Sequence, residues 1–362
     1  MYRVISATEL ARRLGAPDEP FVLDVREPSE FSEWAIAGAV NIPVDGLVHR
    51  TAELPHDREV VVVCASGGRS AVAAGALAAQ GRPVANLEGG MAAWGAVYDR
   101  AVAHSDGELT VVQVRRRGKG CLSYVVGRAG DAFVIDPSVD VDVYLEVAAD
   151  HGWRITRVFD THLHADHVSG ARALAARTGA TLHLNPADTF EFEFTPLRDG
   201  DVFPLGSGSA LSVAALHTPG HTQGSTVYLV DDRAVLTGDT LFVDGVGRPD
   251  LAERAEEFAR NLYRSLHARV LTLPDDALVL PGHYGDAVRV RADEAVGAPL
   301  HELRATLEAL SFDEDTFVAW ATERATPRPP NYVEIITVNM GRSSLSGAEL
   351  AQLEAGPNRC SV

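Results

Sequence analysis

The chain has 362 residues, an apolar content of 46% and a formal net charge of -18 at pH 7. At about 150 residues per domain, this length predicts two or three domains, and the apolar content is sufficient to bury a core in each. The negative charge excludes a nucleic-acid-binding role, which needs a basic face, and an anionic membrane surface would repel the chain.

Targeting signals and the cysteine content indicate which cellular compartment to expect. The first twenty residues contain no apolar segment of the signal-peptide type, and no apolar run approaches the ~18 residues of a membrane-spanning helix. The three cysteines, Cys64, Cys121 and Cys360, are odd in number and far apart, so they predict no disulfide framework. We therefore expect a reducing, cytoplasmic setting, in which a single well-placed cysteine is a candidate nucleophile.

Residues 1–100 predict an α/β unit with a parallel sheet. The segments "PFVLDVRE" (20–27) and "EVVVVCAS" (59–66) are short, continuous and β-branched, as buried strands are, and "PVANLEGG" (83–90) is expected to be another. The alanine-rich run 69–81 predicts a helix that ends at Gly81.

A loss of apolar pattern at 97–109 indicates a domain boundary, and we interpret 101–108 as a linker. Strands and helices then alternate through a second domain, residues 109–312, and a C-terminal extension, 313–362, is expected to pack on it. The extension begins with a short acidic helix, and "PRPPNYVEIITVN" (327–339) is expected to open extended because of its prolines. The cationic run "RRRGKG" (115–120) is interpreted as a solvated hairpin turn rather than a basic patch.

The first chemical motif is a cysteine followed by a glycine-rich loop. Cys64 comes at the end of a predicted strand, and a helix begins near Ser70. Such a strand–loop–helix turns several backbone N–H groups into one concavity, and the helix N-terminus adds partial positive charge. Both effects favour a thiolate or a persulfide, whereas the alternative is an inert, buried cysteine at a strand end.

The whole N-terminal region resembles a rhodanese (sulfurtransferase) domain, on the pieces "LDVREPSEF", "IAGAVNIP", "CASGGRS" and "LEGGMAAW". The resemblance implies that Cys64 carries sulfane sulfur and that Arg69 orients an anionic donor or acceptor. It also implies that loop backbone groups cradle the persulfide, namely those of Ala65, Ser66, Gly67 and Gly68. Asp24 and Arg26 match a conserved pair of the family and are expected to be structural, while Ala35 departs from a histidine found in many relatives.

The second motif is a set of histidines and aspartates, each placed just beyond a predicted strand. The set consists of His162, His164, Asp166, His167, His221, Asp239 and His283. Ligands gather at strand ends in layered α/β folds, and imidazoles with carboxylates suit Zn, Fe or Mn. The remaining histidines show no such clustering and are expected to be surface or packing residues; His217 is the least certain, because it lies close to His221.

This set resembles the metallo-β-lactamase superfamily over about residues 109–300, which implies an αββα sandwich with the site at one edge of the two sheets. A glyoxalase II-like thioester hydrolase would bind two metals: His162, His164 and His221 on one, Asp166, His167 and His283 on the other, with Asp239 bridging. A persulfide dioxygenase of the ethylmalonic encephalopathy protein type would bind one Fe(II) through His162, His221 and Asp239 alone. The other four residues would then surround the ligands, so the inventory does not decide between the two.

The flanking sequence favours the dioxygenase. "VDGVGRPDL" (243–251) resembles the "GRxD" segment of persulfide dioxygenases, and "PRPPNYVEIITVN" resembles their C-terminal extension. Arg248 is expected to bond Asp250 and hold this loop, or else to reach carboxylates of a thiol substrate. Fusion of the two domains adds a chemical link, since the sulfite made by one is a co-substrate of the other.

The sequence therefore predicts an enzyme that oxidises a low-molecular-weight persulfide with O2 to sulfite at one Fe(II), coupled to sulfur transfer that makes or consumes thiosulfate. Zinc is the alternative metal, and a dinuclear thioester hydrolase is the alternative enzyme. In a further alternative the rhodanese-like domain is a sulfur sensor or docking module without turnover. The thiol carrier, the direction of sulfur flow and a possible homo-oligomer stay open.

Overall fold

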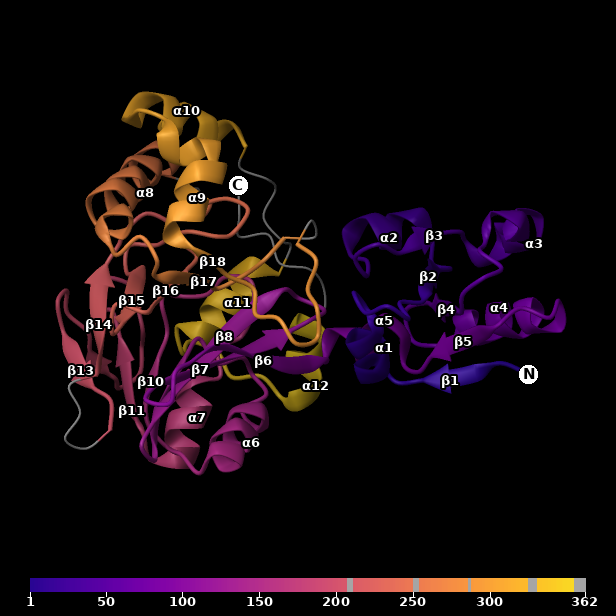
Figure 1. Ribbon diagram of the computed structural model, residues 1–362, viewed down its shortest axis with the longest axis horizontal. Helices are drawn as coiled ribbons and strands as arrows, with labels where there is room; N and C mark the ends of the chain where they lie inside the picture. Colours follow the sequence, from indigo (N-terminus) through magenta and orange to yellow (C-terminus); the bar gives the residue numbers. More distant parts are fainter. Residues whose placement is uncertain (207–210, 250–253, 286–287, 325–330, 355–362) are drawn as a thin grey trace.

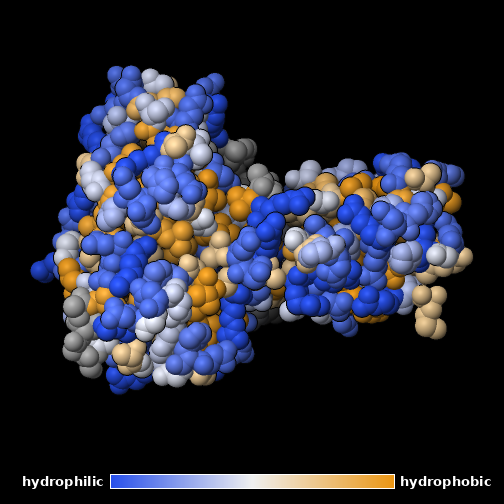
Figure 2. Space-filling view, in the orientation of Figure 1, coloured by the Kyte–Doolittle hydropathy of each residue, from blue (hydrophilic) through white to orange (hydrophobic). Residues whose placement is uncertain are grey.

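The computed structural model describes residues 1–206, 211–249, 254–285, 288–324 and 331–354. These residues form a smaller N-terminal domain and a larger domain, which lie side by side with the N-terminus at the far end of the smaller one (Figure 1). Hydrophilic residues predominate over both domains on the face drawn in Figure 2.

The N-terminal domain is built on a five-stranded sheet of order β1-β5-β4-β2-β3, in which every pair is parallel. Its strands are β1 (Arg3–Ile5), β2 (Phe21–Asp24), β3 (Val40–Asn41), β4 (Val60–Val63) and β5 (Val84–Leu87). The helices are α1 (Ala7–Arg13), α2 (Pro28–Glu33), α3 (Leu47–Arg50), α4 (Gly68–Ala79) and α5 (Gly90–Gly95), with short 3-10 turns η1 (Val44–Gly46) and η2 (Thr51–Glu53).

The central strand β4 shows why its sequence is continuously apolar. Val61 and Val63 join a core that contains α1 and α5, whereas Val60 and Val62 join a second core that contains α3 and α4. Both faces of the strand are therefore buried, which is the normal situation in a parallel sheet covered by helices.

The segment that precedes the second domain is a strand. Residues Tyr98–Ser105 form β6, which pairs with β7 (Thr110–Arg116), so a strand overlaps the expected linker 101–108. It is the outermost strand of its sheet and is exposed at several positions, which accounts for its polar composition.

The larger domain contains two sheets packed face to face. A seven-stranded sheet has the order β12-β11-β10-β9-β8-β7-β6 and a six-stranded sheet the order β13-β14-β15-β16-β17-β18. Beyond β6 and β7, the strands of the first are β8 (Cys121–Arg128), β9 (Asp131–Ile135), β10 (Arg154–Phe159), β11 (Thr181–Leu184) and β12 (Thr195–Pro196). Those of the second are β13 (Val202–Pro204), β14 (Ser212–His217), β15 (Thr226–Val230), β16 (Ala234–Gly238), β17 (Leu278–Pro281) and β18 (Ala298–Pro299).

Helices cover the outer faces of both sheets, which makes the domain an αββα sandwich. The inner core joins residues of the two sheets, such as Tyr124 and Tyr228. On the seven-stranded sheet lie α6 (Asp142–His151) and α7 (Ala171–Thr178). On the six-stranded sheet lie α8 (Ala255–Ala268), η3 (Val270–Thr272), α9 (Leu300–Thr306), η4 (Glu308–Ser311) and α10 (Glu314–Glu323).

The C-terminal extension contacts the larger domain at two places. α10, the expected acidic helix, buries Phe317 in the same core as Leu262 of α8. The helices α11 (Tyr332–Asn339) and α12 (Gly347–Leu353) place Ile335 and Leu353 against Val168. Most of "PRPPNYVEIITVN" is therefore helical, and its proline-rich opening at 327–330 lies outside the described residues.

The interpretation of "RRRGKG" as a solvated turn is wrong. The segment does form the turn between β7 and β8, but its cations are buried: the side chain of Arg115 is 0% exposed, that of Arg116 6% and that of Arg117 5%. The turn docks against the N-terminal domain, where Trp34 Nε1 donates to the carbonyl of Gly118 at 2.7 Å. Arg116 finds a partner at that junction, the Gly95 carbonyl, whereas Arg115, Arg117 and Lys119 bond groups of the larger domain. Local composition does not reveal these partners.

Candidate metal centre and sulfur loop

The sulfur of Cys64 lies at the end of β4, inside the loop that leads to α4. It accepts a hydrogen bond from the backbone N–H of Gly67 at 3.1 Å and one from the hydroxyl of Ser70 at 3.3 Å. Gly67 has φ 97°, and this left-handed conformation is what turns its N–H toward the sulfur. Burial alone would raise the pKa of the Cys64 thiol, but the hydrogen bonds outweigh burial and the pKa is lowered.

Helix α5 fixes the same loop from the other side. Met91 N donates to the carbonyl of Cys64 at 2.8 Å and Ala92 N to that of Ala65 at 3.1 Å. A Cβ on Gly90 would lie 2.1 Å from the Cys64 carbonyl oxygen, so only glycine allows this approach. Ala65, Ser66 and Gly68 are exposed, and the loop therefore opens to solvent above a buried sulfur.

The structure gives Arg69 a partner that the sequence analysis does not foresee. Its guanidinium forms two hydrogen bonds of 2.7 Å with the carboxylate of Glu30. This pairing lowers the pKa of Glu30 to about 2. An anion at the loop would thus compete with Glu30 for Arg69. Asp24 and Arg26, expected to be structural, form a buried ion pair of 2.7 Å.

In the larger domain, three candidate ligands converge as a group. His162, His221 and Asp239 follow β10, β14 and β16, and each offers a ligand atom within 4.8 Å of the others. Asp239 Oδ2 lies 3.8 Å from His162 Nε2 and 3.5 Å from His221 Nε2. All three atoms are buried and have no hydrogen-bond partner among the described residues.

The protonation states in this group also suit a metal ion. Burial lowers the pKa of His162 well below its usual value and lowers that of His221. Burial would raise the pKa of Asp239, but His283 and the other imidazoles outweigh it and lower the pKa. Two neutral imidazoles, one carboxylate and three orphaned buried atoms fit a divalent metal.

Each candidate ligand is oriented through its second polar atom. The hydroxyl of Thr161 lies 2.9 Å from His162 Nδ1, and the backbone carbonyl of Arg248 accepts from His221 Nδ1 at 3.0 Å. Asp239 Oδ1 lies 2.7 Å from His283 Nδ1. Metal-binding side chains commonly have such partners, which fix the ring tautomer and leave the other atom free for the ion.

His164 belongs to a separate group. Its Nε2 lies 3.2 Å from Asp136 Oδ1 and 3.8 Å from Asp160 Oδ1. Burial would lower the pKa of His164, but these two carboxylates raise it well above its usual value. Its Nε2 is therefore engaged by carboxylates, while its Nδ1 is buried without a partner among the described residues and its ring centroid lies 4.2 Å from that of His162.

The remaining candidates form a third group, which includes a cysteine. Asp166, His167, His283 and Cys121 place ligand atoms within 4.8 Å of one another, and all four are buried. His283 Nε2 lies 2.7 Å from Asp166 Oδ2, so its ring connects this group to Asp239. Burial would raise the pKa of Cys121, but the imidazoles of His167 and His283 lower it to about 6.

The described part of the substrate-loop candidate, residues 243–249, contributes through its backbone. Arg248 is 1% exposed, and its carbonyl holds His221, which accords with a structural role for this position. Asp250, its expected partner, lies outside the described residues. His217, the uncertain histidine, bonds the carbonyl of Gln223 at 2.7 Å and has no place in the three groups.

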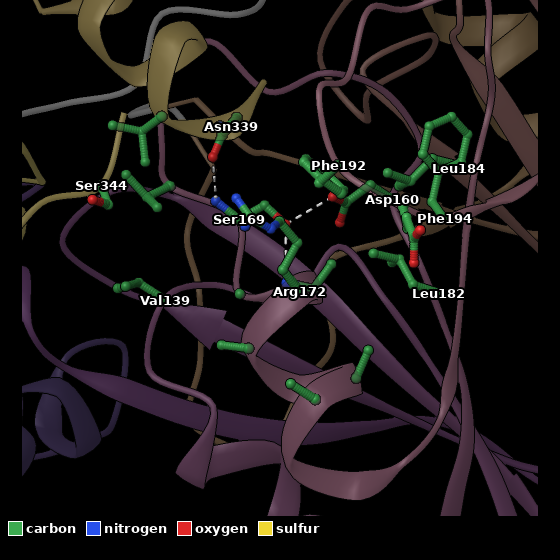
Figure 3. Close-up of a pocket in the computed structure, with 18 of the residues that line it drawn as sticks. Val139, Asp160, Ser169, Arg172, Leu182, Leu184, Phe192, Phe194, Asn339 and Ser344 are labelled. Atoms are coloured by element: carbon green, nitrogen blue, oxygen red, sulfur yellow. Dashed lines mark hydrogen bonds between the residues drawn. The ribbon is translucent and has the colours of Figure 1, made fainter. Parts of the chain in front are cut away.

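Sequence reasoning missed the residues that hold the metal-binding loop, 160–170. Asn339 donates to the carbonyls of His164 and His167 at 2.9 and 2.8 Å and accepts from Ser169 N at 2.9 Å. A cavity of about 940 Å³ lies behind this loop, between α7 and the C-terminal extension. Figure 3 shows Ser169 there, bonded to both Asn339 and Asp160.

Asp136 and Asp160 were also overlooked, although both carry a signal that was visible. Each is the first residue after a buried strand, as Asp239 is. For Asn339 no local signal exists, because it lies 172 residues from His167 along the chain.

Comparison with known proteins places both domains. The model of the metallo-β-lactamase superfamily matches residues 116–283, and that of the rhodanese-like domain matches residues 6–97. An uncharacterised protein of Mycobacterium leprae is 36% identical over an alignment of 204 residues, which covers 48% of this chain and 90% of that protein. These matches confirm the predicted fold class.

Two further comparisons concern a hydrolase and a crystal structure. The hydroxyacylglutathione hydrolase of Methylococcus capsulatus is 38% identical over 158 residues, 43% of this chain and 58% of that protein. The crystal structure of ETHE1 from Myxococcus xanthus superposes with a TM-score of 0.57 and 31% identity, over 64% of this chain and 98% of that one. Among the described residues, no helix combines the length and apolar character needed to cross a membrane.

Proposed function

We propose that this chain, which belongs to the metallo-β-lactamase superfamily and carries a rhodanese-like domain, is a persulfide dioxygenase with sulfurtransferase activity. Its substrates would be a low-molecular-weight thiol persulfide and O2, and its metal one Fe(II) held by His162, His221 and Asp239. The N-terminal domain would exchange sulfane sulfur between Cys64 and sulfite or thiosulfate. The free thiols of Cys64 and Cys121 accord with the reducing cytoplasm.

The observation that carries this proposal is the 2.7 Å contact between His283 Nδ1 and Asp239 Oδ1. A carboxylate that bridges two metals through both of its oxygens needs Oδ1 free, but here Oδ1 is engaged by His283. Only Oδ2 faces His162 and His221. A set of two imidazoles and one carboxylate is typical of non-haem Fe(II) oxygenases and leaves positions open for substrate and O2.

His164 fits either candidate. Its Nε2 bonds Asp136 Oδ1 at 3.2 Å, while its Nδ1 is buried without a partner among the described residues and its ring centroid lies 4.2 Å from that of His162.

The residues of the chain have defined tasks in this reaction. Bound Fe(II) would supply the binding and activation of O2. Thr161 and the Arg248 carbonyl hold the two imidazoles in the tautomer that leaves Nε2 free. Overall, one persulfide, one O2 and one water give one thiol and one sulfite, and the four electrons lost by the outer sulfur reduce O2.

The sulfur loop would then use the product. When Cys64 carries a persulfide, sulfite attacks its outer sulfur, the S–S bond breaks, thiosulfate forms and the Cys64 thiolate is released. Donors from Gly67 and Ser70 stabilise that thiolate as a leaving group.

The test is oxygen uptake by the Fe(II)-loaded chain with glutathione persulfide. Stoichiometric uptake is expected in the wild type and is expected to vanish in His221→Gln, which removes one ligand. His217→Gln is the matched control, because that imidazole lies four residues earlier and bonds only the Gln223 carbonyl among the described contacts. Cys64→Ser should lose thiosulfate chemistry and retain oxygen uptake.

A second candidate is a thioester hydrolase of the glyoxalase II type. The 38% identity to a hydroxyacylglutathione hydrolase and the third group, with Asp166, His167 and His283, favour it. Cleavage of S-lactoylglutathione without oxygen uptake on any persulfide would establish it and exclude the dioxygenase. A rhodanese-like domain that only senses sulfur would form the Cys64 persulfide without passing it to sulfite or cyanide.

A further inference from the structure

The turn between β7 and β8 joins the two candidate sites through one buried side chain, that of Arg116. Its Nε donates to the carbonyl of Gly95 at 3.0 Å, and its NH1 pairs with the carboxylate of Glu354. The side chains of Arg116 and Glu354 are only 6% and 3% exposed. A single guanidinium therefore contacts the N-terminal domain on one side and the C-terminal extension on the other.

Glu354 continues this connection to the metal-binding loop. Its Oε1 accepts a hydrogen bond of 2.5 Å from the backbone N–H of Val168, the residue that follows His167. From the same turn, Lys119 Nζ donates to the carbonyl of Asp166 at 2.5 Å. Glu354 and Lys119 thus hold the backbone around His167 together with Asn339, and Glu354 depends on Arg116 for its counter-charge.

On the opposite side, Gly95 connects Arg116 to the sulfur loop. Gly95 is the last residue of α5, and the first turn of α5 donates to the carbonyls of Cys64 and Ala65. Because a six-residue helix is a rigid unit of about 9 Å, the two ends of α5 move together. Hydrogen bonds therefore run without a break from the Cys64 loop to the backbone beside His167.

Stability alone gives a weak reason for this ion pair. Taking both charges out of water costs about as much as their attraction returns, so buried pairs contribute more clearly to a specific geometry than to net stability. The neighbouring Arg115 provides a contrast. It is buried as deeply, but its partners among the described residues are Asp99 and the carbonyls of residues 291, 292 and 294, none of which belongs to the metal-binding loop.

We propose that Arg116 is a positioning residue, which holds the metal-binding loop through Glu354 and ties it to the rhodanese-like domain through Gly95. The proposal rests on the proposed metal centre at His162, His221 and Asp239, but not on the reaction performed there. Arg116 contacts segments of its own chain, so the connection between the two domains acts within one molecule.

The test measures metal affinity directly, by competition between the full-length protein and a chelator for Co(II), together with the visible absorption spectrum of the bound Co(II). In Arg116→Gln the affinity is expected to fall by ~10–100-fold with an altered spectrum, which is the usual effect of losing a group that orients metal ligands. Arg115→Gln is the matched control: it should lower the melting temperature and leave affinity and spectrum unchanged. Equal losses in the two variants, or none in Arg116→Gln, would overturn the proposal.

Two more variants separate the parts of the connection. Arg116→Lys keeps the cation beside Glu354 but offers no fork to reach Gly95 as well, so an intermediate affinity is expected. Wild-type behaviour of this variant would refute the two-ended bridge. Glu354→Gln keeps an acceptor for Val168 and removes the ion pair; it should also bind Co(II) more weakly, and it decides the matter if Arg116→Gln does not fold.

The Co(II) affinity test does not depend on which reaction the metal centre performs. A wild-type chain that binds Co(II) but oxidises no persulfide would refute the proposed function and leave the role of Arg116 measurable. A wild-type chain that binds no Co(II) would refute both.

Discussion

At the scale of single residues, the two buried cysteines differ in what surrounds the sulfur. Cys64 accepts hydrogen bonds from a backbone N–H and a hydroxyl at the opening of a loop. Cys121 lies 3.9 Å from Asp166 Oδ2 in a closed group with two imidazoles. Both thiols have a lowered pKa, but only the loop of Cys64 has exposed residues above the sulfur, so only Cys64 is placed to exchange sulfur with a solute.

Alkylation of Cys64 should therefore depend on pH in a predictable way. Because its pKa is lowered in the folded chain, the thiolate is present at a lower pH than in the unfolded chain. The Cys64 thiolate stabilises the folded chain at pH values above the pKa of this thiol in the unfolded chain. That stabilisation is lost as the pH falls through the pKa of the thiol in the folded chain. Iodoacetamide labelling, followed by mass spectrometry of the Cys64 peptide, should have its midpoint below that of the urea-unfolded protein.

The hydroxyl of Ser70 is the donor to remove as a check on this explanation. Ser70→Ala should move the labelling midpoint upward, toward that of the unfolded chain, because one hydrogen bond to the sulfur is lost. Ser66→Ala is the control, since its side chain is exposed at the loop. An unchanged midpoint in Ser70→Ala would mean that the backbone donors suffice.

At the scale of elements, the sequence predicts which candidate ligands come together, because a parallel or mixed sheet brings the ends of its strands to one edge. His162, His221 and Asp239 each follow a strand whose apolar run is visible in the sequence. The elements that support them could not be predicted in the same way. Asn339 and Glu354 reach the metal-binding loop from helices of the C-terminal extension, and that docking depends on tertiary packing around Val168.

The same limit explains the error at "RRRGKG". Cations in a turn suggest solvent, because local sequence shows no partner for them. Arg116 finds Glu354 at a separation of 238 residues, and Lys119 finds a carbonyl 47 residues away. Only the docking of three distant segments makes the turn an interior element.

Asn339 provides a test of how far the extension supports the metal-binding loop. Asn339→Ala removes three hydrogen bonds and leaves two buried carbonyls and one N–H without this partner, so unfolding in urea should show a loss of about 1–3 kcal/mol. Metal affinity should fall as well. Thr337→Ala is the matched control, since Thr337 lies on the same helix but its hydroxyl bonds the carbonyl of Val333 within that helix; it should leave metal affinity unchanged.

Helix α5 can be tested where it meets the sulfur loop. Gly90 has φ +57°, and a Cβ there would lie 2.1 Å from the Cys64 carbonyl. Gly90→Ala should therefore cost more than the ~1–2 kcal/mol of a left-handed residue and should reduce sulfur transfer to cyanide. Gly81→Ala, with φ +76° and open space around it, should cost the conformational part alone and keep that activity. Equal effects of the two substitutions would show that sulfur transfer does not need the close approach of α5 to the Cys64 carbonyl.

At the scale of the whole molecule, the two domains have separate cores and a polar junction. The buried apolar residues of the N-terminal domain end at Val97, and those of the sandwich clusters begin at Leu109, with Tyr98 and Ala103 packed against them. Between them, Trp34 Nε1 donates to Gly118 and Arg117 N donates to Val97 at 3.0 Å. A junction of this kind orients the domains but contributes little apolar burial, so each domain is expected to unfold largely by itself.

Removal of the metal should expose this division. A bound ion stabilises only the domain that holds it, by about 2.7 kcal/mol when its free concentration is a hundred times its Kd. Chelation also leaves His162 Nε2, His221 Nε2 and Asp239 Oδ2 buried without a partner. Scanning calorimetry should therefore show two transitions, of which chelation lowers the one that belongs to the sandwich.

Sulfur transfer from thiosulfate to cyanide by Cys64 identifies the other transition, because this activity should survive chelation and disappear at a temperature that chelation does not change. Asp239→Asn, which weakens the metal site itself, should show the lowered transition before any chelator is added and respond little afterwards. A single transition, or an equal shift in both, would mean that the polar junction binds the two domains into one cooperative unit. In that case the connection through Arg116 would carry folding free energy as well as geometry.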